Sequence, residues 1–142
     1  MVNDSLCASL MTKHLIETGR KRIAHIMGPS IIRNTTERAI AYQQMLTDHS
    51  IFDPDLIIKT KGVSFEDGRN AAQQLLNLNK DFDSIFAFTD TLAIGAMNYL
   101  LDQGIKIPQQ VSIASFSGTE LAIMVHPQLT SVEQPMVHMG EV

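Results

Sequence analysis

Apolar residues follow two alternating patterns along the chain. Short continuous apolar runs, such as 85–88, are typical of strands buried on both faces, whereas apolar positions three and four residues apart are typical of amphipathic helices. The expected strands are 22–27, 55–60, 84–88, 111–116 and 129–132. The expected helices are 4–18, one that opens at Thr35 or Thr36 and carries Ile40, Met45 and Leu46 on its apolar side, one that starts at 64–67, 91–103 and a short one at 120–125.

The alternation of strands and helices predicts an α/β fold, a three-layer α/β/α arrangement in which a parallel sheet is covered by helices on both faces. In such sheets ligands bind beyond the carboxyl ends of the strands. The segments at that edge are therefore the first place to look for a site. They are 28–38, 62–65, 89–90 and 117–119.

The composition limits the classes of protein to which this chain can belong. The 142 residues suit one domain, and with 44% hydrophobic and 18% charged residues they can form a core. The net charge of −4 argues against direct binding of nucleic-acid phosphates by this chain alone. A single cysteine, Cys7, excludes an internal disulfide and fits a reducing compartment. No apolar run approaches the roughly 20 residues of a membrane helix.

Signatures of enzymes and metal sites are missing from the sequence. The five histidines show no paired metal-ligand spacing, and neither HExxH nor CxxC occurs. The segment 115–118, SFSG, lacks the leading glycine of a nucleophile elbow, and the Gly28-Pro29-Ser30 segment reads as a turn and not as a phosphate loop. We therefore predict no catalytic residue, no metal and no cofactor.

Three segments together resemble one family. HLIETGRKRIAHIMGP at 14–29, IFAFTDTLAIGAMNYLLDQGIKIPQQVSIASF at 85–116 and HPQLTSVEQPMVHMGE at 126–141 resemble the effector-binding core of LacI/GalR-type bacterial transcription regulators. The shorter RAIAY at 38–42 fits the same order. The resemblance implies a periplasmic-binding-protein-like core: two α/β lobes hinged by crossing strands, with a small ligand between them.

The resemblance also implies a division of the chain. Residues 1–20 resemble the last helix of the N-terminal lobe, 21–130 most of the C-terminal lobe, and 131–142 the crossing back. The DNA-binding headpiece and most of the N-terminal lobe have no counterpart, so the chain is interpreted as a fragment whose Met1 is an expression start. The expected partners are a sugar or related metabolite as effector, a second copy in a homodimer, and operator DNA only through the headpiece. The implied location is the cytoplasm, with no membrane contact.

Two other functions stay open at this point. One is a fragment of a periplasmic-type sugar-binding transport protein, which shares the same core. The other is a small enzyme of flavodoxin-like α/β fold.

Several residues at the carboxyl edge are candidates for binding the effector. Arg38 is either a solvated arginine or, as the resemblance implies, a planar fork that holds ligand oxygens. Thr89 is expected to face the cleft, and its neighbour Asp90 to cap the following helix. The weaker candidates are Asn34, Val63, Phe65 and Ser117, and Thr119 is expected to cap. The family often has an aspartate at the position of Ser117, so a clamp for sugar hydroxyls is in question there.

The dimer surface is the last expectation. Apolar residues occur on more than one side of helix 91–103, and the segment around 125–127 follows the short helix. The resemblance places them at the dimer-forming surface, and the apolar stripe of the first helix is expected to be left open. The expected interface residues are Leu92, Met97, Leu100, Leu101, Val125 and His126.

Overall fold

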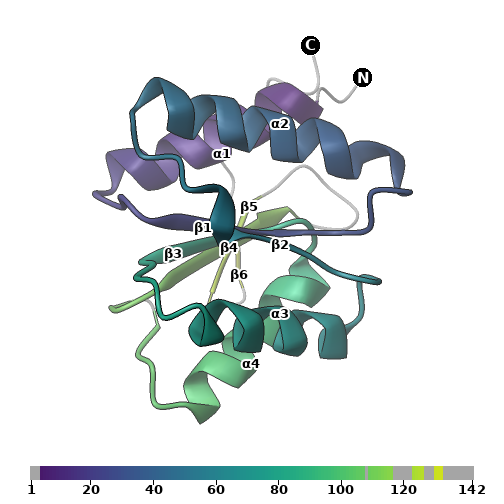
Figure 1. Cartoon of the computed structure of the whole chain (residues 1–142), viewed down its shortest axis with the longest axis vertical. Coiled ribbons are helices and arrows are strands. Elements are labelled where there is room, and N and C mark those ends of the chain that lie inside the picture. Colours follow the sequence, from purple (N-terminus) through teal and green to yellow (C-terminus); the bar gives the residue numbers. More distant parts are fainter. Residues whose placement is uncertain (1–3, 108, 117–122, 127–129, 133–142) are drawn as a thin grey trace.

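The computed structural model describes residues 4–107, 109–116, 123–126 and 130–132. Up to residue 116 its helices and strands alternate as the sequence predicts, except that a 3-10 helix at 54–56 replaces the start of the predicted strand 55–60 (Figure 1). In chain order they are α1 (Asp4–Glu17), β1 (Ile23–Met27), α2 (Arg33–Asp48), the 3-10 helix η1 (Pro54–Leu56), β2 (Ile57–Lys59), α3 (Phe65–Asn77), β3 (Ser84–Ala87), α4 (Asp90–Asp102), β4 (Ser112–Phe116), β5 (Ile123–His126) and β6 (Thr130–Val132).

The strands form one sheet in the order β2-β1-β3-β4-β5-β6, and the first four are parallel. Helices α1 and α2 cover one face of this sheet and α3 and α4 cover the other (Figure 1). The predicted three-layer α/β/α fold around four parallel strands is therefore confirmed. Each parallel step passes through a helix because a crossover must return the chain to the same end of the sheet.

The short helix predicted at 120–125 is wrong where the structure describes it. Residues 123–126 form strand β5, which pairs antiparallel to β4, with Phe116 opposite Ile123 and Ala114 opposite Val125. A short apolar run fits a strand or a buried helical turn equally well, so its long-range pairing decides. Strand β6 continues the sheet at Thr130–Val132, where the last strand was predicted.

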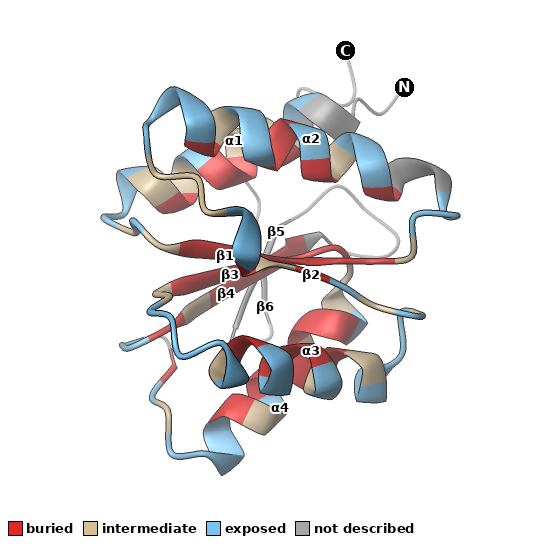
Figure 2. Ribbon diagram, in the orientation of Figure 1, coloured by how far each residue is buried: buried red, intermediate tan, exposed pale blue. Residues whose placement is uncertain are grey.

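The core lies in two layers, one on each face of the sheet (Figure 2). All five residues of β1 are buried, as expected for a parallel strand covered on both sides. Most of the described apolar stripe of α1 is covered: Ala8, Met11 and Leu15 are buried with Tyr42 and Phe86, whereas Leu6 is 38% exposed. Helix α1 is thus packed into this layer, which weakens the open stripe as a reason for self-association.

Helix starts follow capping chemistry in one case and depart from it in another. Helix α3 begins with a capping box, in which the Ser64 hydroxyl accepts from the Asp67 amide at 3.1 Å and the Asp67 carboxylate accepts from the Ser64 amide at 3.1 Å. Helix α2 begins at Arg33, earlier than predicted, and Ile32 supplies no side-chain cap. Thr35 is buried instead of capping, and Ile40, predicted on the apolar side, is 60% exposed.

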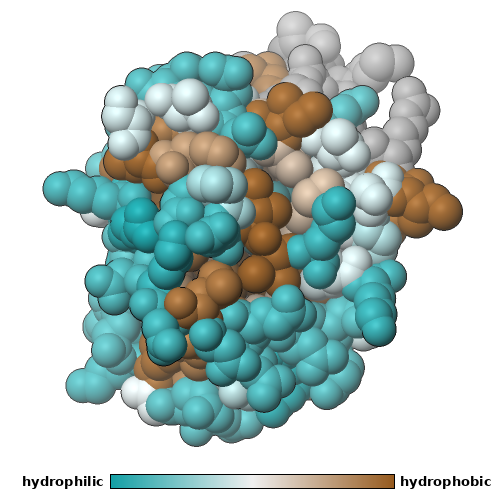
Figure 3. All heavy atoms as spheres, in the orientation of Figure 1, coloured by the Kyte–Doolittle hydropathy of each residue, from teal (hydrophilic) through white to brown (hydrophobic). Residues whose placement is uncertain are grey.

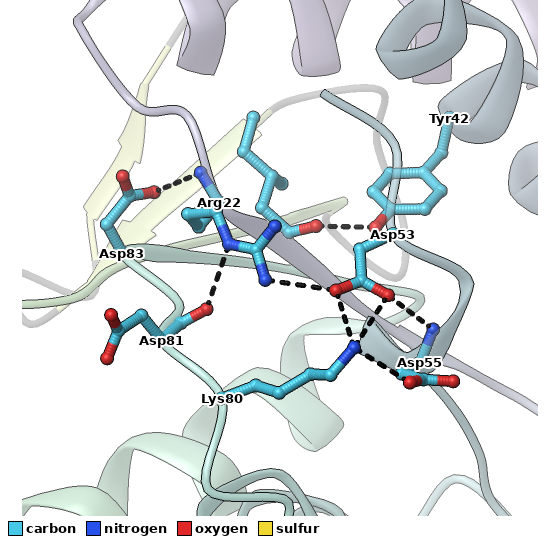
Figure 4. A network of polar contacts seen from close by, with 8 residues as sticks. Arg22, Tyr42, Asp53, Asp55, Lys80, Asp81 and Asp83 are labelled. Carbon is cyan, nitrogen blue, oxygen red and sulfur yellow. Dashed lines mark hydrogen bonds and ion pairs between the residues drawn. The ribbon is translucent and has the colours of Figure 1, made fainter. Parts of the chain in front are cut away.

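An ionic network ties the amino ends of β1, β2 and β3 together (Figure 4). The Asp53 carboxylate lies 3.0 Å from the Arg22 guanidinium and 3.0 Å from the Lys80 ammonium, and Lys80 also lies 2.8 Å from Asp55. Arg22 donates a further bond to the Asp81 carbonyl at 3.2 Å. Three segments far apart in the sequence therefore share one set of charges, at the end of the sheet opposite the expected site.

We expect Asp53→Ala to lower the free energy of unfolding by about 1.5–3 kcal/mol at pH 7, because hydrogen bonds to charged groups are worth that much and the side chain is only 13% exposed. The bond from Lys80, with those from the Asp55 amide and Arg22, holds the pKa of Asp53 below its usual 3.8. The stabilisation by the ionised Asp53 carboxylate is fully present above the usual aspartate pKa. It is lost as the pH falls through the lower pKa that Asp53 has in the folded protein.

Urea unfolding, followed from pH 7 down to below the usual aspartate pKa, measures the effect of Asp53→Ala. Asp81→Ala is the matched control, since it removes the same charge, but only the backbone carbonyl of exposed Asp81 enters the network. It should change the free energy of unfolding by less than about 0.5 kcal/mol. Equal effects of the two substitutions would mean that the network adds nothing to stability.

Candidate functional site

The order β2-β1-β3-β4 places a topological switch point between β1 and β3. From β1 the chain crosses over to β2 on one side, and from β2 it crosses to β3 on the other side of β1. The loops that leave the carboxyl ends of β1 and β3 therefore run in opposite directions. Ligands of open α/β sheets bind at such a point.

Arg38 bridges this switch point. It lies in α2, beyond the carboxyl end of β1, and its guanidinium donates a hydrogen bond to the Phe88 carbonyl at the end of β3, at 2.8 Å. The guanidinium carbon also lies 4.7 Å from the centre of the Phe88 ring, in a cation–π contact. The half-buried Arg38 is thus held in one orientation by a residue 50 positions away, which a solvated surface arginine is not.

Gly28 completes this arrangement from the β1 side. A Cβ atom at Gly28 would lie 2.6 Å from the Phe88 ring, so any larger residue displaces the ring on which Arg38 stacks. The sequence predicted a turn at this glycine, within the 28–38 segment at the carboxyl edge, but not its contact with Phe88. A glycine directly after a buried strand is also the signal of a close approach by another chain segment, and it could have pointed to Phe88.

The N-cap of α4 is Thr89 and not Asp90, for which the cap was predicted from the sequence. Thr89 is the N-cap of α4, and its hydroxyl accepts a hydrogen bond from the Leu92 amide at 3.3 Å. Asp90 is the first residue inside the helix, where its negative charge suits the positive end of the helix dipole. The predicted cap at Asp90 is therefore wrong by one residue. Half-buried Thr89 lies at the switch point directly after Phe88.

The other candidates are partly described. Val63 and Phe65 lie in the loop after β2 and at the start of α3, and they are 37% and 41% exposed. Ile31 and Ile32, in the loop after β1, are 91% and 37% exposed and were not predicted. Four large apolar side chains thus lie in or next to two loops at the carboxyl edge of the sheet, and apolar groups commonly line small-molecule sites. Outside the described residues or side chains lie Asn34, Ser117, Thr119, Val125 and His126.

Three residues predicted for the dimer surface belong to the core instead. Leu92 and Leu100 are fully buried and Met97 is 8% exposed. All three belong to α4 and pack into the core that this helix forms with α3 and the sheet. Helix α4 is apolar on several sides because it is covered on several sides. Leu101 is the member of the predicted set that is described and lies on the surface, at 47% exposure.

His25 in β1 is a buried titratable group on the face of the sheet that α1 and α2 cover, in contact with Tyr42. Its ring stacks on Phe86 at 4.5 Å and lies 4.9 Å from the ring of Tyr42. Nδ1 lies 2.7 Å from the Phe86 carbonyl, which only accepts, so Nδ1 carries the proton. Burial lowers the pKa of His25 to about 4, and the positive charge of Arg38 adds to this effect. His25 is therefore neutral at physiological pH.

The described residues contain no group of three histidine, cysteine or acidic side chains placed to hold a metal ion. The same part of the chain contains no helix that is long and apolar enough to span a membrane.

Comparison with known proteins gives the class. Residues 12–142 match the model of the periplasmic binding protein-like domain. The ribose operon repressor of Halalkalibacterium halodurans is 32% identical over 95% of this chain and 40% of its own length. The transcription regulator CcpA of Lactococcus lactis has 34% sequence identity and a TM-score of 0.75 over 98% of this chain and 51% of its own.

A sugar-binding transcriptional regulator of the LacI family from Escherichia coli, complexed with phosphate, gives a TM-score of 0.78 and 28% sequence identity over 84% of this chain and 43% of its own. The chain belongs to the family of periplasmic binding protein-like domains. The relatives named above are transcriptional regulators, and the resemblance to the LacI/GalR effector-binding core is confirmed. The chain spans about two fifths of the length of its curated relatives.

Proposed function

We propose that this chain is an effector-sensing lobe of a LacI/GalR-type transcriptional regulator. The observation that carries the proposal is the bridge from Arg38 to Phe88 across the switch point. It anchors a guanidinium, the side chain best suited to planar oxygen groups, at the place where this fold class binds ligands. Periplasmic-type transport proteins share the fold, but the regulators among the relatives favour the sensing role over transport.

The effector in this proposal is a sugar or a related metabolite. Arg38 would donate to ligand oxygens, Thr89 would offer its hydroxyl, and Val63 and Phe65 would contact apolar faces of the ligand. The printed names of two relatives, a ribose operon repressor and a sugar-binding regulator, support this class of ligand. Asn34 and Ser117 remain candidates for further hydrogen bonds, and Thr119 for a cap.

The regulator as a whole would act by a shift between two arrangements of its lobes. An effector changes this equilibrium only as far as it binds one arrangement more tightly than the other. In this proposal the regulator is a homodimer in the cytoplasm. It would bind operator DNA through a separate headpiece. For the dimer we propose the outer side of α4, where exposed Leu101 and half-buried Ile94 lie seven residues apart and so on one face.

The division of the chain is also a proposal, with one revision. Helix α1 shares a core with α2 and the sheet, so we place it in the same lobe as β1–β4 and not in the N-terminal lobe. Residues 131–142 would cross back to that other lobe.

Arg38→Ala should weaken effector binding to the full-length regulator by roughly 1.5–3 kcal/mol, the worth of a hydrogen bond to a charged group, or about 10- to 150-fold in dissociation constant. The effector would first be identified by thermal shift from a panel of pentoses, hexoses and their phosphate esters. Calorimetric titration into both proteins then measures the loss. Operator affinity without effector should change little, because Arg38 lies in the ligand lobe.

Arg69→Ala is the matched control for lost packing. Arg69 is also a partly buried, ring-stacked arginine, 5.3 Å above Tyr99, but it joins α3 to α4 and ion-pairs with Asp102 at 3.2 Å. Its removal should leave effector affinity within about twofold. If Arg38→Ala binds effector as tightly as wild type, Arg38 only braces Phe88 and the proposed site fails.

A further inference from the structure

Phe88 contacts Arg38 through two different groups. Its backbone carbonyl accepts a hydrogen bond from Arg38 Nη1 at 2.8 Å, and the centre of its ring lies 4.7 Å from the guanidinium carbon. The hydrogen bond fixes the position of one nitrogen, and the contact with the ring restrains the rest of the guanidinium. Together the two contacts set the direction in which Arg38 presents its N–H groups.

Phe88 is itself held by the core of the protein. Its amide donates to the Ile26 carbonyl at 3.0 Å, which extends the pairing of β3 with β1 by one residue. Its side chain is 5% exposed and belongs to the core that α3 and α4 form with the sheet. On the face shown in Figure 3 the surface over α3 is largely hydrophilic, and the buried side of this helix faces the sheet. The support of Arg38 is therefore part of a packed core and not of a loop.

Gly28 lies against the same ring. A Cβ atom at Gly28 would lie 2.6, 3.0 and 3.3 Å from three carbons of the Phe88 ring, and these are the atoms nearest to it. Gly28 is not among the described glycines with a positive φ, so alanine brings no left-handed backbone strain there. Gly28→Ala would therefore act first by moving the ring, without changing its chemistry.

A fixed guanidinium binds a ligand at a lower entropic cost than a mobile one. An arginine side chain loses much rotamer freedom when a ligand immobilises it, and a side chain that is already ordered avoids this loss. A guanidinium carries several N–H donors, so Arg38 can hold the Phe88 carbonyl and ligand oxygens at the same time. The contacts that order Arg38 should therefore increase its affinity for a ligand.

We propose that Phe88 is a positioning residue for effector binding, and that Gly28 is a glycine because a side chain there would displace the Phe88 ring. Both residues act through Arg38, and neither has to touch the ligand. This inference rests on the proposed binding role of Arg38, but the orientation of Arg38 can be measured without an effector.

The first test records the Nε–Hε NMR signals of the arginine side chains in the whole chain, and Arg38→Lys assigns the Arg38 signal by its loss. Phe88→Leu keeps the carbonyl and removes the ring, whereas Gly28→Ala keeps the ring and moves it. In both variants the Arg38 signal should move toward the position of an exposed arginine, and rotation about its Nε–Cζ bond should become faster. If Phe88→Leu does not fold, Gly28→Ala decides. An unchanged Arg38 signal overturns the proposal.

The second test measures binding to the full-length regulator by calorimetry. The probe is the one of ribose, galactose, ribose 5-phosphate and glucose 6-phosphate that raises the melting temperature most. Phe88→Leu should weaken its binding by about three- to tenfold, the worth of a cation–π contact. In an Arg38→Ala background the same substitution should change affinity by less than about twofold.

Phe82→Leu is the matched control, because Phe82 packs against the same core at the amino end of β3. It should leave probe affinity within about twofold of wild type. An equal effect of Phe88→Leu with and without Arg38 would show that Phe88 acts on the fold alone and would overturn the proposal. If none of the probes binds, the ligand class of the proposed function fails, and the arginine signals alone decide whether Phe88 orders Arg38.

Discussion

Gly95→Ala should lower the free energy of unfolding by about 2–3 kcal/mol, although alanine favours helices over glycine by about 1 kcal/mol. A Cβ atom at Gly95 in α4 would lie 2.1 Å from the Phe65 carbonyl oxygen and 3.1 Å from the Arg69 amide nitrogen, both in α3. These are backbone atoms at the packed helix interface, so no side chain can turn aside. The two helices have to separate, and the contacts between them weaken.

Gly68→Ala should have the same effect from the other helix. A Cβ atom there would lie 2.2 Å from the Leu92 carbonyl oxygen in α4. Once one substitution has pushed the helices apart, the second meets less resistance. The double variant should therefore lose clearly less stability than the sum of the two single variants, by more than about 0.5 kcal/mol.

Urea unfolding of the single and double variants measures this coupling. Gly104→Ala is the control: its Cβ would meet no atom within 4 Å, but its φ of +81° makes alanine unfavourable by about 1 kcal/mol. Its cost should add to that of Gly95→Ala without coupling. Additive costs for Gly68→Ala and Gly95→Ala would contradict a shared helix contact. The contact matters for the site because α3 starts at Phe65 and α4 at the Thr89 cap.

The protein should also lose about 3 kcal/mol of stability between pH 6.5 and 4 through His25 alone. The folded pKa of His25 is about 4, against 6.5 for an exposed histidine, because burial disfavours the charged ring. Within this window the unfolded chain binds a proton that the folded chain does not. The contribution is therefore complete above pH 6.5 and is lost as the pH falls, at up to about 1.4 kcal/mol per pH unit.

His25→Gln should reduce the slope of the free energy of unfolding against pH in this window. The reduction should correspond to the uptake of about one proton on unfolding. The glutamine amide can still donate to the Phe86 carbonyl, which limits the loss at pH 7. His49→Gln is the matched control, at an exposed histidine after α2, and should keep the slope of wild type. An unchanged slope in His25→Gln would show that His25 titrates as an exposed histidine does.

The sequence predicted the positions of β1 to β4 and β6, most clearly for β3, where the apolar run is almost unbroken. It also located the start of α3, where Ser64 and Asp67 form a local capping box. Its errors lie where local signals compete or are absent. The run at 123–126 suited a helix until its pairing with β4 was known. Helix α2 begins at Arg33 with no side-chain cap, so the nearby Thr35 misled the prediction.

The position of the candidate residues at the carboxyl edge was predictable from the sequence, but the contacts between them were not. Parallel-strand topology alone indicated the carboxyl edge, and Arg38 and Thr89 do lie there. The contact between Arg38 and Phe88 joins residues 50 positions apart, and no local pattern encodes it. Burial of Leu92 and Leu100 was missed for the same reason: which sides of an apolar helix are covered depends on its neighbours, and α4 packs against both α3 and the sheet.

A crystal structure of the full-length regulator with its bound effector tests the central claim most directly. The account predicts density for the ligand at the carboxyl edge of β1 and β3, with ligand oxygens within hydrogen-bond distance of the Arg38 guanidinium and near the Thr89 hydroxyl. Ligand density elsewhere on this lobe, with Arg38 bonded only to the Phe88 carbonyl, would contradict it.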